Sequence, residues 1–182
     1  MSLVISDTKS STLEPLKKNR WFIQFTSIPG LEGVTGATDN LAFCCHTGAR
    51  PDVGFSEAEA DRLNEKFWIA GKPEWNELEF GFYDYIQGAS SASNILYEWS
   101  KRVYNPITGQ MGFKIQYTTS AVIAMLDPQG GIVQVWNLFY AWPKKISWDS
   151  MDASDTGLAQ VKLSLRYDYA IKPQDINTTP SA

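Results

Sequence analysis

The sequence is short of the residues on which most catalytic and metal-binding sites depend. Among its 182 residues it has one histidine, His46, and two cysteines, Cys44 and Cys45. The cysteines are neighbours, so a disulfide between them cannot join distant elements of the chain. Cys44 and His46 share a face of a predicted strand, but a zinc site needs three or four ligands and no further cysteine or histidine exists. The sequence therefore predicts no metal and no cofactor, and we expect His46 to be a packed or surface residue.

Long hydrophobic runs and an excess of positive charge are also missing. No run is long enough to span a bilayer, and residues 1–7 lack the charged start and apolar stretch of a signal peptide. The 16 Lys and Arg residues are outnumbered by 20 Asp and Glu residues, which gives a net charge of −4. A protein that grips nucleic acid through its phosphates needs a basic face. We therefore expect no membrane contact, synthesis in a cytosol, and no tight binding of DNA.

Aromatic residues are abundant, with 7 Trp, 8 Tyr and 9 Phe. Such residues favour the half-buried surfaces of β-sheets. Strands are expected over residues 20–26, 41–47, 77–84, 114–126, 132–142 and 160–169, with a turn at 127–131. Alternation places one set of apolar side chains on the core face of two of these strands: Leu78, Phe80 and Phe82 in the first, and Val161, Leu163, Leu165, Tyr167 and Tyr169 in the second.

One segment has helical periodicity instead. Ala92, Leu96, Trp99 and Val103 recur at spacings of four, three and four, preceded by serines and followed by Asn105-Pro106. The predicted class is therefore α+β, mainly antiparallel β, with one flanking helix. We expect a single domain over residues 19–171, between a flexible N-terminal arm over 1–18 and a flexible C-terminal tail over 172–182.

No group of residues in the sequence argues for catalysis. Asp149, Asp152 and Asp155 recur every third residue, whereas a calcium loop uses every second position and ends in glutamate. The alternating carboxylates between residues 57 and 61 have almost no apolar neighbours to build a shielded cleft. A solvated hairpin explains that stretch better, and the chain is predicted not to be an enzyme.

In the order and the local amino-acid sequence of several segments, the chain resembles the tail tube proteins of contractile-tailed bacteriophages, which are related to the tube proteins of type VI secretion systems. The resemblance covers about residues 19–170. It is carried by the segments Asn19–Phe25, Leu41–Pro51, Lys66–Gly71, Trp75–Asp84 and Trp142–Asp149, and by the final amphipathic strand to Tyr169.

This resemblance implies a β-sandwich or barrel-like subunit with one flanking helix, six of which close into a ring. Rings stack into a tube, the conduit through which DNA and the tape measure protein pass without tight binding. The implied partners are further copies, the tail sheath, a baseplate tube initiator and a tail terminator. The implied location is the virion tail, assembled in the host cytoplasm. An initiator of the same fold is an alternative.

The resemblance also implies an inter-ring contact in the charged stretch after Gly54. Its candidate residues are Glu57, Glu59, Asp61, Arg62, Glu65 and Lys66. Mixed charge is suited to fixing the register of stacked copies. A function of another class stays open, namely a monomeric ligand-binding β-domain. Its binding platform would be formed by Trp68, Trp75, Trp142 and Trp148.

Overall fold

The structure is a computed structural model and describes residues 15–173. Most of the predicted arm over 1–18 and tail over 172–182 lies outside these residues, so the domain boundaries stay a prediction. In chain order the elements are β1 (Trp21–Phe25), α1 (Ala37–Cys44), β2 (Cys45–Thr47), β3 (Val53–Arg62), β4 (Glu65–Trp75), β5 (Leu78–Tyr83), the 3-10 turn η2 (Gly88–Ser90), α2 (Ala92–Val103), α3 (Lys114–Tyr117), β6 (Thr119–Leu126), β7 (Ile132–Trp148), β8 (Gln160–Arg166) and β9 (Tyr169–Ile171).

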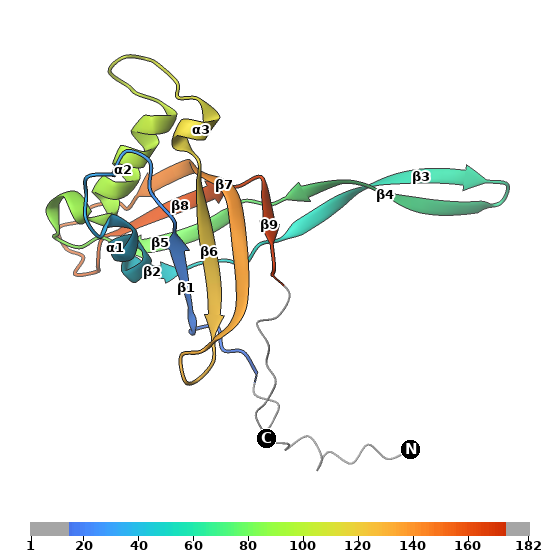
Figure 1. The fold of residues 1–182 in the computed structure, drawn as a ribbon, viewed down its shortest axis with the longest axis horizontal. Coiled ribbons are helices and arrows are strands. Elements are labelled where there is room, and N and C mark those ends of the chain that lie inside the picture. The colour runs from blue at the N-terminus through green and yellow to red at the C-terminus, as the bar shows by residue number, and fades with distance from the viewer. Residues whose placement is uncertain (1–14, 174–182) are drawn as a thin grey trace, which may run out of the picture.

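Seven strands form one curled antiparallel sheet in the order β1-β6-β7-β8-β5-β2, with β9 also paired to β7 (Figure 1). The long strand β7 pairs with β6 and β9 through its first part and with β8 through its last part. Between these parts an extra residue shifts the register against β6, and Tyr140 there has a φ of 55°. Such a bulge bends a strand and increases its twist. The predicted class, mainly antiparallel β with a barrel-like sheet, is confirmed.

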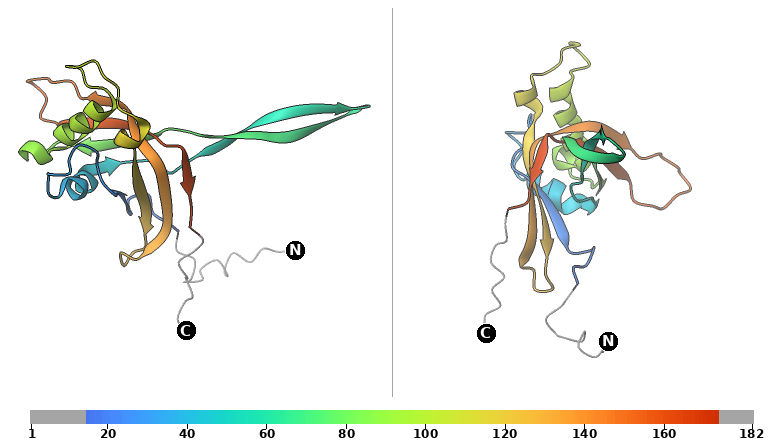
Figure 2. Two further views of the ribbon diagram at one scale, coloured as in Figure 1. Left: turned by 45° about the horizontal axis from the view of Figure 1, so that its top comes forward. Right: turned by 90° about the vertical axis from the view of Figure 1, so that its right-hand side faces the viewer.

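The core lies between this sheet and the helices α1 and α2 (Figure 2). The predicted core faces are confirmed, because Leu78, Phe80 and Phe82 are buried, as are Val161, Leu163, Leu165 and Tyr167. Tyr169 is an exception. It is 39% exposed, because β8 ends at Arg166 and the chain continues into the separate edge strand β9.

The predicted helix over residues 92–103 is confirmed as α2. It begins after Ser91, whose hydroxyl accepts a hydrogen bond from the backbone N–H of Asn94 at 3.3 Å. Ile95, Leu96 and Trp99 are completely buried. The indole N–H of Trp99 donates to the carbonyl of Tyr117 at 2.8 Å, which ties α2 to the short helix α3. The turn over 127–131 is confirmed too, with the Asp127 carboxylate accepting from the backbone N–H groups of Gln129 and Gly131.

Two predicted strands are partly wrong. Residues 37–44 form the helix α1, and only Cys45–Thr47 is extended. Ala37, Leu41 and Cys44 are buried at helical spacing, whereas Phe43 is 80% exposed. In the sequence, the apolar run that contains Leu41, Phe43 and Cys44 is also typical of a strand, and this explains the wrong prediction. The segment predicted to start at Lys114 begins with the single helical turn α3, and strand β6 begins only at Thr119.

Candidate assembly interface

A long hairpin projects from the body of the subunit (Figure 1). Its strands β3 and β4 form a separate two-stranded sheet and pair only with each other. Within it, every residue from Gly54 to Glu74 is exposed except Ala60, which is half-buried. The solvated hairpin predicted for this stretch is therefore present, and it extends further along the chain than the charges alone indicated.

All six residues predicted for an inter-ring contact lie on this hairpin, but on two different faces. Cross-strand partners share a face of a sheet. The pairs Glu57–Ala70, Glu59–Trp68 and Asp61–Lys66 form one face, and Lys66 makes an ion pair with Glu59. We call this the acidic face. The pairs Ala58–Ile69, Ala60–Phe67 and Arg62–Glu65 form the opposite face. We call this the apolar face, because only its end nearest the turn is charged.

The apolar face was missed in the sequence because the register was unknown. Ala58 and Ala60 alternate visibly with the glutamates, but their neighbours across the hairpin follow only from the turn at Leu63-Asn64. Leu63 has a φ of 56° and a completely exposed side chain. Positive φ is uncommon for a branched residue, and a glycine or asparagine is usual at such a turn position.

The root of the hairpin is fixed to the core. The ring of Trp75 lies 5.9 Å from the ring of the buried Tyr167. Asn76 donates to Asp52 through both its backbone N–H, at 3.1 Å, and its side-chain amide, at 3.0 Å. These contacts join the two strands where they leave the body, so the direction of the hairpin is set by the core.

The curled sheet ends in strands with open edges. Among the described residues, β1 pairs only with β6, β2 only with β5, and β9 only with β7. The outer backbone groups of such strands are a template for pairing with another chain. The short β2 and β9 and the five-residue β1 thus offer edges at both ends of the sheet.

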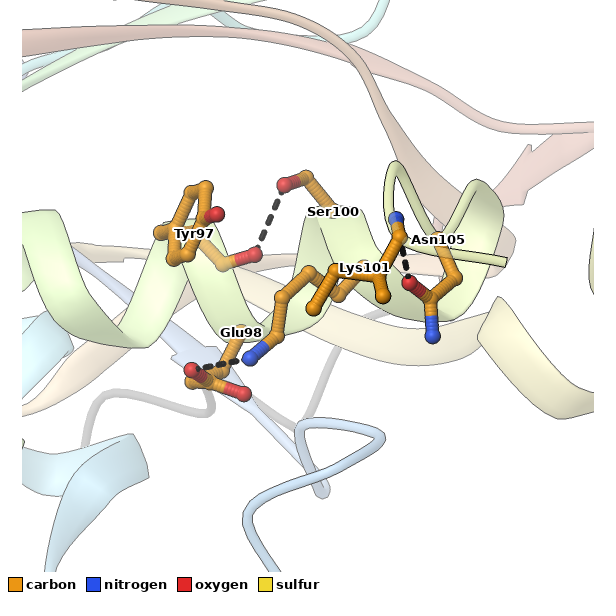
Figure 3. A network of polar contacts seen from close by, with 6 residues as sticks. Tyr97, Glu98, Ser100, Lys101 and Asn105 are labelled. Carbon is orange, nitrogen blue, oxygen red and sulfur yellow. Dashed lines mark hydrogen bonds and ion pairs between the residues drawn. The ribbon is translucent and has the colours of Figure 1, made fainter. Parts of the chain in front are cut away.

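A groove of about 330 Å³ lies between α2 and the end of β7, lined partly by Tyr97, Tyr104 and Trp148. Lys101 also lines it, with its Nζ atom 2.7 Å from Oε1 of Glu98 and 5.4 Å from the centre of the Tyr97 ring (Figure 3). The ion pair of Lys101 is made within α2, and Lys144 and Lys145 also line the groove, so it combines aromatic rings with basic side chains.

The four tryptophans proposed as a ligand platform are not brought together. Trp68 is on the hairpin and Trp75 packs at its root. Trp142 contacts Tyr117 with ring centres 5.8 Å apart, and Trp148 contacts Tyr97 at 6.5 Å. Each ring thus has its own neighbours, and no common surface unites the four.

The cysteines and the histidine are packed residues. Cys44 is buried in the core, and His46 stacks on Tyr83 with ring centres 4.0 Å apart. Burial, with a smaller contribution from Cys44, raises the pKa of the Cys45 thiol to about 12. A thiol with so high a pKa is almost entirely protonated at neutral pH and is a poor nucleophile.

The acidic residues after β7 serve the turn that contains them. Asp152 accepts hydrogen bonds from the backbone N–H and the hydroxyl of Ser154, which lower the pKa of its carboxyl group. Asp155 accepts from the backbone N–H of Gly157 at 2.8 Å. Within residues 15–173, no cluster of three or more His, Cys, Asp or Glu side chains is arranged to hold a metal. The helices of this part of the chain are all too short or too polar to cross a membrane.

Known proteins share this architecture. Residues 86–171 match the family model described as the T4-like virus tail tube protein gp19. The extended sheath-tube complex of the PVC extracellular contractile injection system contains a chain 16% identical, covering 94% of this chain and 98% of that one with a TM-score of 0.63. A chain of the anti-feeding prophage baseplate is 14% identical, and the match covers 88% of this chain and 96% of that one with a TM-score of 0.64. The SPP1 tail tube protein is 16% identical, and the match covers 91% of this chain and 83% of that one with a TM-score of 0.54. No curated protein matched.

The family match over residues 86–171 and the likeness in fold agree in pointing to tail tube proteins, which confirms the resemblance predicted from the sequence. The family match lies in the C-terminal half of the chain, whereas the likeness in fold extends over most of it. The matched family is one of tail tube proteins, which are structural proteins rather than enzymes.

Proposed function

We propose that six copies of this chain close into a ring and that the rings stack into a tail tube, the conduit for DNA and the tape measure protein. A tail sheath surrounds the tube, a baseplate initiator starts it and a tail terminator ends it. Assembly takes place in the host cytoplasm, and the finished tube is part of the virion. The family match and the fold support this proposal at the level of a tube protein, and the surfaces of the subunit support the finer steps.

The single observation that carries the proposal is the open, curled sheet. Within residues 15–173, the edge strands at both ends of the sheet pair on one side only. Closed symmetry satisfies such edges, because each copy presents one edge to the copy before it and the other edge to the copy after it. The curvature introduced by the bulge in β7 favours a ring over a flat ribbon of copies.

The projecting hairpin supports stacking of rings. We propose that Glu57, Glu59, Asp61, Arg62, Glu65 and Lys66 act in the contact between rings, as the resemblance implies. Trp75 at the root of the hairpin packs on the buried Tyr167, and the length of the hairpin lets it reach beyond the body of its own subunit (Figure 2). Interactions between charges fix register and exclude wrong partners more than they add affinity.

A tube initiator at the baseplate is the second candidate. The likeness in fold to a chain of the anti-feeding prophage baseplate supports it. An initiator and a repeating subunit differ in whether assembly continues after the first ring. The repeating subunit is the proposal that we favour, because the hairpin gives each ring a means to contact the next.

Electron microscopy of the purified protein over a range of concentrations tests the proposal. The repeating subunit is expected to form rings and then tubes that lengthen as the concentration rises. An initiator is expected to give single rings or short stacks that do not lengthen. If only particles of the size of one subunit are found at the highest concentration, the tube proposal is wrong and a monomeric binding domain becomes the better explanation.

A further inference from the structure

The apolar face of the hairpin is uncovered in the subunit. Phe67 is 45% exposed and Ile69 is 54% exposed, although each is flanked by a small alanine on the opposite strand. Outside the hairpin, no element in the part of the chain that the structure describes pairs with β3 or β4. An isolated two-stranded hairpin is at best marginally stable in water, so a surface that covers this face would stabilise it.

The two faces of the hairpin differ in what they need from a partner. The carboxylates of the acidic face are well solvated where they are, and removing them from water is costly unless each is paired. Phe67 and Ile69 gain free energy when they leave water, whatever covers them. Trp68, which is 58% exposed, lies on the acidic face, but its burial there would also remove the neighbouring carboxylates from water. The physical preference is therefore for contact through the apolar face, with the acidic face left toward solvent.

A cavity with both apolar and cationic side chains in its lining lies on the body of the subunit. It has a volume of about 390 Å³, and its apolar lining includes Trp21, Ile123 and Met125. Lys18 and Arg50 also line it. Neither cation forms an ion pair within residues 15–173. On the apolar face of the hairpin, Glu65 lies across from Arg62 but makes no ion pair with it or with any other residue in this range.

The hairpin cannot fill the cavity of its own chain, because it points away from the body that carries the cavity (Figure 1). A second copy can. We propose that the apolar face of the hairpin docks on this cavity of a second copy, with Phe67 and Ile69 against the apolar lining and Glu65 beside Lys18 and Arg50. The acidic face then stays in contact with solvent. This inference rests on the proposed assembly into stacked rings and names the surfaces that meet.

A matched pair of double variants separates the two faces. Phe67→Ser with Ile69→Thr removes apolar surface from one face, and Glu57→Gln with Glu59→Gln removes charge from the other. All four side chains are exposed, so both variants should melt like the unchanged protein. We expect the first to raise the critical concentration for tube formation at least about tenfold, and the second to change it less than about threefold.

A charge reversal tests the cavity. Arg50→Glu is expected to weaken tube formation, and adding Glu65→Arg to that variant is expected to restore it, because the attraction is rebuilt with the signs exchanged. Both readouts are electron microscopy and sedimentation of tubes, with a thermal melt to show that each variant is folded.

The outcomes distinguish the docking inference from the proposed function. If the unchanged protein forms tubes and the serine-threonine variant forms them equally well, docking through the apolar face is wrong while the tube function stands. If the apolar face matters but the second charge reversal restores nothing, the cavity is not the receiving surface and the docking inference is overturned. If the unchanged protein forms no rings or tubes, the proposed function itself fails.

Discussion

At the scale of single residues, adjacent positions on β8 have opposite surroundings. Leu163 is completely buried and pairs with Phe80 of β5 and Ile146 of β7. Lys162, its neighbour along the chain, is exposed and pairs with Gly81 and Ser147. The strand is central in the sheet, so a side chain that points inward has no route to water.

Leu163→Asp is therefore expected to cost about 3 kcal/mol or more in the free energy of unfolding, because it places a carboxylate without a partner among apolar side chains. Lys162→Ser is the matched control and should change that free energy by less than about 0.5 kcal/mol. Chemical denaturation measured by circular dichroism gives both values. Equal stability of the two variants would show that the assignment of faces is wrong.

At the scale of elements, the hairpin and the body contribute separately to folding and assembly. The hairpin root is held by Trp75 and Asn76, which follow the exposed stretch from Gly54 to Glu74 in the chain. Ser56 closes the inner end of that ribbon, where its hydroxyl donates to the carbonyl of Lys72 at 3.4 Å. The outer part can therefore be removed without disturbing the contacts that join it to the core.

Replacing residues 57–70 by an Asn-Gly turn is expected to leave a folded subunit whose thermal melt matches that of the unchanged protein, since the deleted side chains bury almost nothing. Asn-Gly suits the tight turn that such a short connection needs. The shortened protein should fail to form long tubes when viewed by electron microscopy. Tubes of native length and appearance would place the contact between rings outside the hairpin, with the N-terminal arm over residues 1–18 as the next segment to test.

At the scale of the whole molecule, net charge bears on how the proposed tube would interact with DNA. The chain carries a net charge of −4, and protein–DNA affinity depends on neutralising phosphates with Lys and Arg. The acidic face of the hairpin adds local negative charge to an exposed surface. A proposed tube built from such subunits would repel DNA weakly and would not hold it in passage.

Assembled tubes are therefore expected to bind duplex DNA weakly or not at all. A gel-shift experiment at low ionic strength is the most demanding measurement, because screening of charges is weakest there. The comparison sample is the Glu57→Gln, Glu59→Gln variant, which lowers the negative charge without adding a cation and should still not bind. Tight binding by the unchanged tubes at low salt would contradict the idea of an inert conduit.

The sequence alone determined the elements whose pattern is local. Alternation in β5 and β8 predicted which side chains face the core, and the spacing from Ala92 to Val103 predicted α2. The turn at 127–131 followed from its Asp, Pro and Gly residues. In the helix and the strands, the spacing of apolar residues indicates which side chains are buried. It also distinguishes a helix from a strand, because side chains repeat about every 3.6 residues in a helix and every 2 residues in a strand.

Only the tertiary structure decided the rest. An apolar run such as residues 41–47 fits a strand or a buried helix, and contact with β1 selects the helix α1 for most of it. The charges of the hairpin were visible in the sequence, but the register that gathers Phe67 and Ile69 on one uncovered face was not. Which residues share a face depends on pairing between distant positions, and pairing is fixed by turns and by the core, which no single stretch of sequence contains.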